Sequence, residues 1–234
     1  MVRWIVTRER GEDSPELRLM RAAGAPFVEV PCLESLLAPW PWADVNGVTV
    51  FTSRRAVDSW AVSQAPKPSR VVALAPMTAA HCRAAGLEPE LEIEGGVVAL
   101  AQAMTQRWAW SQHGLEVRYP TSPQGLESAE QRDACRVLAS WARVDRRLAY
   151  EVRAPKNLPK ALAPVVREPW GAVFASPSTV EHFLGACATD GLAPAHVACH
   201  GASTARAWDQ RRPPSWPTAV DASHLEVLLR GEAP

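Results

Sequence analysis

Two stretches of the chain place a serine directly after a short apolar run, and this pattern can bind an anion. The stretches are residues 47–57 and 171–180, and Ser53 of the first corresponds to Ser176 of the second. Each apolar run predicts a buried strand, and the periodic segment after it predicts a helix. A serine at such a junction can cap the helix, while the unpaired amides of the first helical turn can receive a carboxylate. The sequence therefore predicts two similar strand-to-helix junctions, which we call corners. Each corner either binds an anion or is an ordinary helix cap.

Other hydroxyl residues and two arginines occupy comparable positions elsewhere. Hydroxyls both donate and accept hydrogen bonds, and an arginine can bind a carboxylate through two parallel N–H groups. The simpler alternative is that the hydroxyls cap helices and the arginines are solvated. The candidate carboxylate-binding residues are Thr7, Arg8, Ser53, Arg54, Thr78, Thr121, Ser176, Ser178, Ser203 and Thr204.

A metal site is the weaker interpretation of His196, Cys199 and His200. These residues fall on or beside a predicted strand, where positions 196 and 199 face opposite ways. The chain also lacks a P-loop, a G-x-S-x-G elbow and a helical histidine pair with a glutamate. Hydroxyl residues at strand ends therefore remain the most prominent chemical feature.

The composition argues against nucleic-acid binding and against a membrane protein. The 234 residues carry 25 basic and 25 acidic side chains, so no basic footprint is expected. No apolar run approaches the ~18 to 20 residues of a membrane helix, and the first residues resemble a strand more than a signal peptide. The five cysteines form no C-x-x-C pair, which is typical of reduced and buried thiols. We therefore expect a cytoplasmic protein.

The order of the predicted elements indicates a duplicated α/β chain. Short strands alternate with amphipathic helices in each half, and this favours parallel sheets covered on both faces. The pattern restarts near residue 115. Thr7 and Thr121 lie 114 positions apart, whereas Thr78 and Thr204 lie 126 positions apart. Such gradual drift with preserved order is typical of a duplication.

Several short motifs together resemble the uroporphyrinogen-III synthase family over essentially the whole chain. It is the order and spacing of the motifs, more than any single one, that carries the resemblance. The matching pieces are Val6-Thr7-Arg8, Val50-Phe51-Thr52-Ser53, Ala149-Tyr150, Val173-Phe174-Ala175-Ser176-Pro177 and Gly201-x-x-Thr204-Ala205.

The resemblance implies two doubly wound α/β domains joined by a two-stranded antiparallel ladder, with the active cleft between the domains. Residues 1–26 with 155–234 would then form one discontinuous domain, and residues 36–143 the other. The ladder would lie within residues 27–35 and 144–154, on crossing strands at about 27–33 and 146–153.

The resemblance also implies a reaction. The family's substrate, hydroxymethylbilane, is a linear tetrapyrrole with eight carboxylates, and the enzyme closes it with inversion of ring D and loss of water. No metal or organic cofactor is used. Tyr150 would lie on the ladder, where its protonated phenol could assist departure of the substrate hydroxyl. Its alternative role is that of a half-buried strand aromatic. We expect a monomeric enzyme of tetrapyrrole (heme) biosynthesis.

Two places depart from the family pattern and motivate other functions. Ala75 and Pro76 stand where the middle copy of the Gly-x-x-Thr motif would begin, and the segment after Pro120 lacks an early glycine. Without glycine the backbone is less able to approach a ligand closely. One alternative is a non-catalytic relative that binds a polycarboxylated tetrapyrrole or another anionic ligand. A second, an exported solute-binding protein, is disfavoured because no export signal is expected.

Overall fold

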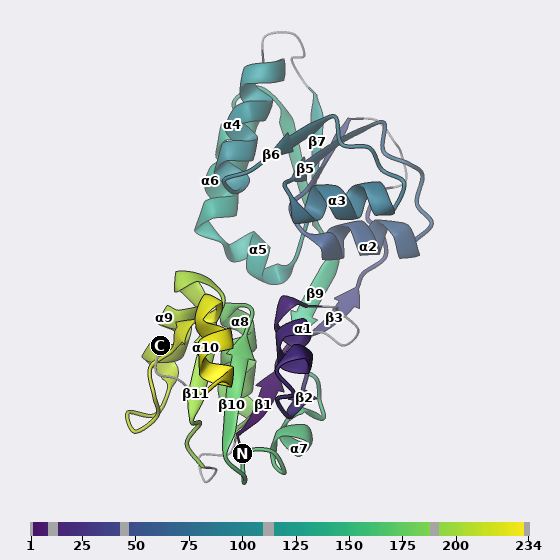
Figure 1. Ribbon diagram of the computed structural model, residues 1–234. Helices are drawn as coiled ribbons and strands as arrows, with labels where there is room; N and C mark the ends of the chain where they lie inside the picture. Colours follow the sequence, from purple (N-terminus) through teal and green to yellow (C-terminus); the bar gives the residue numbers. More distant parts are fainter. Residues whose placement is uncertain (1, 9–13, 43–46, 110–114, 188–191, 232–234) are drawn as a thin grey trace. The chain divides into compact units, whose positions relative to one another are not determined.

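The chain forms two compact units in the computed structural model (Figure 1). Unit 1 contains residues 1–34 and 153–234, and unit 2 contains residues 35–152. Each unit has its own five-stranded sheet, and two further strands form a separate small sheet. The structure describes residues 2–8, 14–42, 47–109, 115–187 and 192–231.

The sheet of unit 1 has the strand order β12-β11-β10-β1-β2, and every neighbouring pair is parallel. In the central pair, Ile5 lies opposite Ala172. All carboxyl ends of the strands therefore meet at one edge of the sheet. The strands are β1 (Arg3–Val6), β2 (Phe27–Glu29), β10 (Trp170–Phe174), β11 (His196–Cys199) and β12 (Val220–Asp221).

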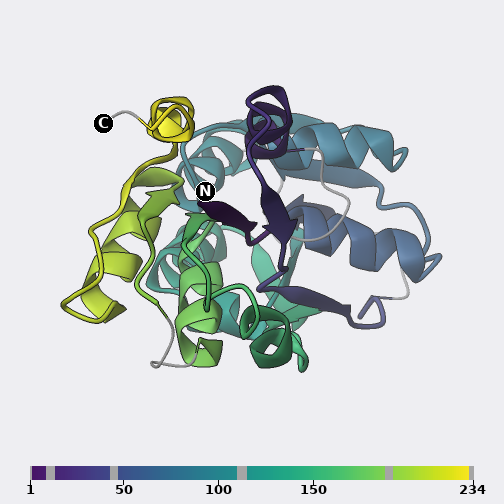
Figure 2. The same ribbon diagram turned by 60° about the horizontal axis from the view of Figure 1, so that its bottom comes forward.

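Alternating side chains of this sheet fill two separate cores, as expected for strands that are buried on both faces. Ile5 and Phe174 point to the core beneath α7, α8 and α9, whereas Trp4 and Val173 point to the core beneath α1 and α10. Figure 2 shows α1 and α10 together on one side of the sheet, with α7 and α8 on the other. The helices are α1 (Pro15–Ala22), α7 (Leu158–Leu162), α8 (Pro177–Ala186), α9 (Gly201–Arg211), α10 (Leu225–Leu229) and the short 3-10 turn η1 (Ala222–His224).

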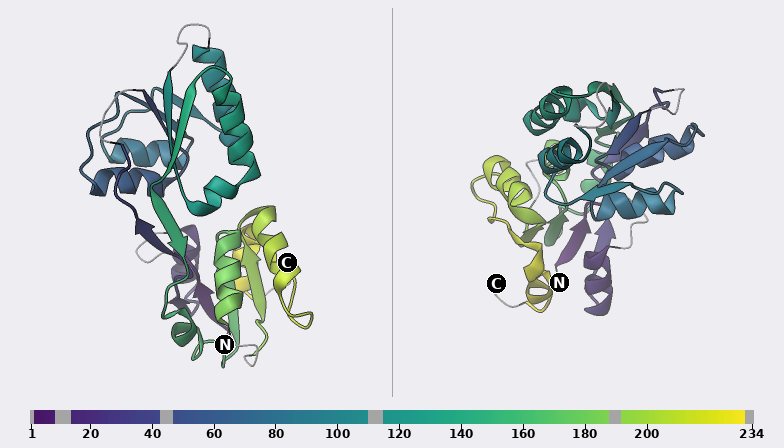
Figure 3. Two further views of the ribbon diagram at one scale, coloured as in Figure 1. Left: turned by 180° about the vertical axis from the view of Figure 1, so that it is seen from behind. Right: turned by 90° about the horizontal axis from the view of Figure 1, so that it is seen from above.

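Unit 2 repeats this plan with the strand order β6-β5-β4-β7-β8, again all parallel. Val50 and Tyr119 pack beneath α4 and α6, and Phe51 and Val71 pack beneath α2 and α3. The left view of Figure 3 shows these helix pairs on opposite sides of the sheet. The strands are β4 (Val48–Phe51), β5 (Arg70–Leu74), β6 (Leu91–Ile93), β7 (Glu116–Thr121) and β8 (Arg143–Leu148). The helices are α2 (Arg54–Val62), α3 (Met77–Ala84), α4 (Val97–Trp108), α5 (Pro123–Glu127) and α6 (Ala129–Ala139).

The small sheet pairs β3 (Glu34–Leu37) with β9 (Tyr150–Arg153) as an antiparallel ladder. Arg153 Nη2 donates to Glu34 Oε1 at 3.0 Å, and the amide of Ala38 donates to the carbonyl of Ala149 at 2.8 Å. The expected fold class, two α/β sheets with a two-stranded ladder, is confirmed. No helix in the described ranges has the length and apolarity required to cross a membrane.

The predicted ladder ranges coincide with the ladder only in part: β9 lies within the expected range 146–153, whereas the expected range 27–33 precedes β3. Residues 27–29 do not cross between units but pair with β1, because Phe27 and Val28 pack into the two cores of unit 1. Residues 143–148 likewise pair with β7, with Val144 against the core of unit 2. The ladder is formed instead by residues that follow each of these strands in the chain.

Three connecting segments contain regular structure of their own. Residues 34–37 form strand β3. The segment 123–139 holds two helices, since Ser128 caps a new helix by accepting from the amide of Gln131. The segment 154–164 contains α7, which packs Leu158 and Leu162 into the core.

Candidate functional site

The carboxyl edge of unit 1 gathers the predicted residues from three neighbouring strands. Thr7 follows β1, Ser176 follows β10, and the segment from His200 follows β11. Thr7 is fully buried, and its hydroxyl donates to the carbonyl of Val173 at 2.8 Å. Its side chain therefore fixes the edge internally and does not extend toward a ligand.

Ser176 caps α8 with a complete capping box. Its hydroxyl accepts from the amide of Thr179 at 3.4 Å, and the Thr179 hydroxyl accepts from the amide of Ser176 at 3.2 Å. Ser178 is half-buried in the first turn of the same helix. The capping interpretation of Ser176 is correct in this structure, and because α8 begins at Pro177, which has no N–H, its first turn offers fewer amides to an anion than that of α9.

The next corner, at the start of α9, has no such cap. His200 is the N-cap residue and no side chain caps the helix. Gly201 has a φ of +74°, a left-handed conformation that favours glycine. Thr204 is 1% exposed beneath the first turn, whereas Ser203 is exposed. The amides of α9 therefore form the more open anion-receiving end in unit 1.

A buried acid lies beside this corner. The Glu16 side chain, in the first turn of α1, is only 3% exposed, and its Oε1 accepts from Arg8 Nη2 at 3.3 Å. The same oxygen contacts Nε2 of His200. Burial alone would raise the pKa of the Glu16 carboxyl, but hydrogen bonds from His200, Ser14 and its own backbone, with the charge of Arg8, lower that pKa to about 2. Glu16 is thus an ionised, buried carboxylate in contact with Arg8 and His200.

The carboxyl edge of unit 2 carries the other predicted hydroxyls. Ser53 caps α2 by accepting from the amide of Arg55 at 3.2 Å. Thr121 is 1% exposed, and its hydroxyl donates to Gln131 Oε1 at 2.9 Å. Thr78 is 7% exposed in the first turn of α3, whose N-cap is Pro76 without a side-chain cap. The Ser53 and Thr121 hydroxyls are thus engaged within unit 2, as those of Thr7 and Ser176 are within unit 1.

Of the two neighbouring arginines, Arg54 is the predicted ligand residue, and both are half-buried at the start of α2. Arg55 Nε donates to the hydroxyl of Ser35 at 2.6 Å, which ties the helix to strand β3. Arg55 therefore has a structural role within unit 2.

Both tyrosines belong to unit 2. Tyr150 is the first residue of β9, is half-buried and packs against the core beneath α2 and α3. Tyr119 is fully buried, and burial raises the pKa of its phenol, with Thr52 opposing the shift and Cys135 and Tyr150 adding to it. The Tyr119 hydroxyl has no hydrogen bond of normal geometry among the described residues. Tyr150 is therefore the phenol with access to solvent.

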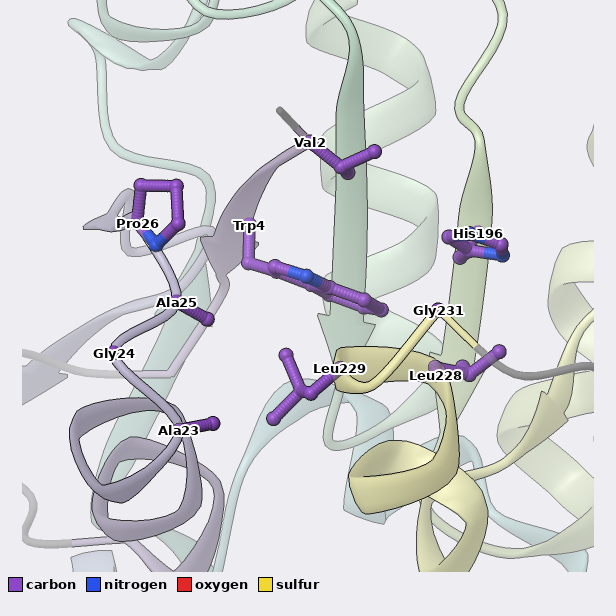
Figure 4. Close-up of a pocket in the computed structure, with 10 residues that line it drawn as sticks. All are labelled: Val2, Trp4, Ala23, Gly24, Ala25, Pro26, His196, Leu228, Leu229 and Gly231. Atoms are coloured by element: carbon purple, nitrogen blue, oxygen red, sulfur yellow. The ribbon is translucent and has the colours of Figure 1, made fainter.

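Two cavities in unit 1 lie away from these predicted residues. A cavity of about 280 Å³ is at the amino-terminal end of the sheet, where the Trp4 and His196 rings stack at 6.1 Å above Leu229 (Figure 4). A second, of about 230 Å³, lies between Val30 and Leu158. In the described part of the chain no group of three or more His, Cys, Asp or Glu side chains could hold a metal ion.

The sequence also matches a known family. The family model described as uroporphyrinogen-III synthase HemD matches residues 16–214. The chain belongs to the uroporphyrinogen-III synthase family. The resemblance deduced from the motifs is thereby confirmed.

Solved structures of uroporphyrinogen-III synthases share the fold. The structure from Helicobacter pylori has a TM-score of 0.63 and 15% identity, covering 99% of this chain and 98% of that one. A mutant from the extremely thermophilic bacterium Thermus thermophilus has a TM-score of 0.57 and 18% identity, with 99% and 97% covered. At this identity the likeness establishes the family's two-domain fold. A search of curated proteins finds no match.

The sequence motifs missed two polar residues of these edges. Glu16 looks like an ordinary acidic residue in the first turn of a helix, where it would complement the dipole from a solvated position. Only the packing of α1 against the sheet makes it buried. His200 was considered only as a metal ligand, and its partner Glu16 is 184 positions away in the chain.

Proposed function

We propose that this protein is a uroporphyrinogen-III synthase that cyclises hydroxymethylbilane, with inversion of ring D and loss of water. The observation that carries the proposal is the family match over residues 16–214. It is supported by the two sheet edges, each of which presents helix N-termini beside hydroxyl residues. A substrate with eight carboxylates needs several anion-receiving groups, and backbone amides at helix N-termini supply them.

The chemistry asked of the protein is mainly positioning. A bound linear tetrapyrrole must be held so that ring D reacts at the carbon that gives the inverted product, and orientation of this kind can supply much of the barrier reduction. The residues proposed to hold the carboxylates are those of the two edges, above all Thr204 with the open first turn of α9, followed by Ser176 and Ser178 at the start of α8. Thr7 and Thr121 support these edges through their buried hydrogen bonds.

Tyr150 is proposed as the proton donor to the departing hydroxyl group. Its phenol is the solvent-accessible one of the two, and it packs against the core that contains Phe51, two residues before Ser53. Loss of water needs one proton for the leaving hydroxyl, and a positioned phenol can provide it. We further propose a cytoplasmic monomer that needs no metal or organic cofactor.

Product analysis tests the proposal. Hydroxymethylbilane is generated enzymatically in situ with and without the protein, the products are oxidised, and uroporphyrins I and III are separated by chromatography. A synthase gives mainly isomer III, whereas spontaneous closure gives isomer I. Only isomer I from correctly folded protein would contradict synthase activity.

The second candidate is a non-catalytic family member that binds a polycarboxylated tetrapyrrole. It is favoured by one corner of unit 2, where α3 begins at Pro76 with neither a glycine nor a side-chain cap. Proline has no backbone N–H, so this corner has one donor fewer for a carboxylate. Isomer I as the product, together with tight binding of uroporphyrin III, would identify this candidate.

A further inference from the structure

The cavity at the amino-terminal end of the unit 1 sheet lies at the opposite edge from the residues proposed to bind the substrate (Figure 4). Its volume is about 280 Å³, whereas an apolar cavity of ~150 Å³ is enough to hold benzene. Trp4 of β1 and His196 of β11 form its floor, and residues 23–26 after α1 and the end of α10 form its walls. The space therefore suits a molecule with two fused rings.

A missing side chain in the central strand of the sheet gives the cavity its aromatic floor. Gly171 of β10 lies between Trp4 and His196 and is the register partner of both. A Cβ at Gly171 would lie 3.1 Å from the Trp4 indole, so only glycine leaves room for that ring. The rings of Trp4 and His196 stack there, with centroids 6.1 Å apart and planes inclined by 11°. A planar aromatic ligand can pack against this pair.

Trp4 also has an unsatisfied donor at this cavity. The residue is only 2% exposed, and a buried tryptophan N–H usually has a hydrogen-bond partner. Within the described ranges the Trp4 indole N–H makes no hydrogen bond, and neither do the ring nitrogens of His196. An acceptor atom on a ligand would satisfy the indole, which costs free energy while it is unpaired.

The charge around the cavity disfavours an anionic ligand. The described residues that line it include no lysine and no arginine. Helices α1 and α10 both end at its wall, so the negative ends of their dipoles lie there. The carbonyl groups at a helix C-terminus lack partners within the helix and can accept hydrogen bonds. The favoured ligand is consequently uncharged and has both an acceptor and an N–H or O–H donor.

We propose that this cavity binds a small, neutral, planar heteroaromatic molecule, which packs against the rings of Trp4 and His196 and accepts a hydrogen bond from the Trp4 indole. Hydroxymethylbilane does not fit this description, because its eight carboxylates would meet no lysine or arginine among the described lining residues. The site is therefore separate from the two carboxyl edges and does not depend on the proposed function.

Isothermal titration calorimetry with three probes tests the site. Carbostyril is neutral, has two fused rings, and carries one carbonyl acceptor and one N–H donor, so wild-type protein should bind it. Indole has a donor but no acceptor, and it should bind about fivefold more weakly because the hydrogen bond from Trp4 is not made. Naphthoate has fused rings of similar size with a negative charge, and it should bind more weakly than either neutral probe.

Variants that fill a cavity provide a matched comparison. Ala25 lines this cavity, and Ala161 lines the second cavity of unit 1, whose described lining includes no aromatic side chain. Ala25→Leu should abolish binding of carbostyril by occupying the space, whereas Ala161→Leu should leave the affinity unchanged. Trp4→Phe keeps an aromatic ring but removes the N–H, so it should weaken binding of carbostyril about fivefold and affect indole less.

Several results would overturn the proposal. They are no binding of carbostyril by folded wild-type protein, equal affinities of wild type and Ala25→Leu, and tighter binding of naphthoate than of carbostyril. Circular dichroism establishes that each variant is folded, and the three probes with Ala25→Leu suffice if Trp4→Phe is not. The isomer that the protein forms from hydroxymethylbilane does not affect this test, so the site and the proposed function stand or fall separately.

Discussion

The two carboxyl edges are built on the same plan but carry different chemistry. In each unit a serine caps the helix after the central strand, Ser53 in one and Ser176 in the other. The next corner differs. In unit 1 it has His200, Gly201 and the buried Glu16, whereas in unit 2 it has Pro76 and no side-chain cap. Unit 2 instead has the two phenols.

This difference suggests a division of labour. Unit 1 has the open first turn of α9 at its edge, which suits binding of carboxylates. Unit 2 has the half-buried phenol of Tyr150, which is proposed as the proton donor. On this view, changes at the unit 1 edge should act on affinity, and changes at the unit 2 edge should act on rate or on stability.

The largest effect is expected for Tyr150→Phe. Removing a proton donor should lower kcat about 100-fold while KM changes little. The measurement is the rate of isomer III formation with hydroxymethylbilane in excess. Tyr119→Phe is the control, because the Tyr119 hydroxyl is buried without a regular hydrogen bond and its removal should cost nothing. Equal rates for wild type and Tyr150→Phe would assign Tyr150 to packing.

Much of the fold could be predicted because it depends on local patterns. The apolar runs of the central strands, such as Val48–Phe51 and Trp170–Phe174, are buried on both faces and are visible in the sequence. The ladder was located only in part, because strands such as 27–29 and 143–148 are only partly buried and their partners depend on the tertiary fold.

The site was predicted less completely for a similar reason. Hydroxyls at strand ends, including Thr204, follow from the strand–helix alternation alone. The burial of Glu16 does not, because it needs α1 to pack across the sheet. The sequence likewise cannot distinguish a hydroxyl that binds a ligand from one, such as that of Thr7, that bonds to a neighbouring strand.

A pair of glycines tests the rigidity of the unit 2 edge. A Cβ at Gly125 would lie 2.0 Å from the Thr121 hydroxyl oxygen, whereas a Cβ at Gly185 in α8 would meet nothing within 4 Å. Gly125→Ala should therefore lower the free energy of unfolding by about 2 kcal/mol through overpacking. Gly185→Ala should raise it by roughly 0.5 to 1 kcal/mol through helix propensity. Urea unfolding measures both, and equal effects would disprove the close contact at Thr121.

Acid should weaken unit 1 through Glu16. The pKa of this carboxyl falls from 4.5 to about 2 on folding, so the unfolded state binds more protons between those values. Stability from this group is therefore complete above pH 4.5 and is lost as the pH falls toward 2. Allowing for solvent around its half-buried partners, the loss amounts to about 2 kcal/mol.

Comparison with Glu16→Gln isolates this contribution. Urea unfolding followed by circular dichroism at about pH 6 and about pH 3, on either side of the unfolded-state pKa, should show a larger decrease in stability for the wild type than for the variant. Parallel decreases would mean that Glu16 is not held ionised in the native state.

The smallest effect compares the equivalent threonines of the two edges. Thr204 and Thr78 are both buried in the first turn of the corresponding helices, α9 and α3. Thr204→Ala should raise KM about fivefold, because the hydroxyl supports the open first turn of α9, where a carboxylate is proposed to bind. Thr78→Ala should raise it less than about twofold, since the proline corner offers fewer donors. Steady-state kinetics on the two variants decides between the edges: a larger effect at Thr78 would place the stronger carboxylate contact in unit 2 and reverse the proposed division.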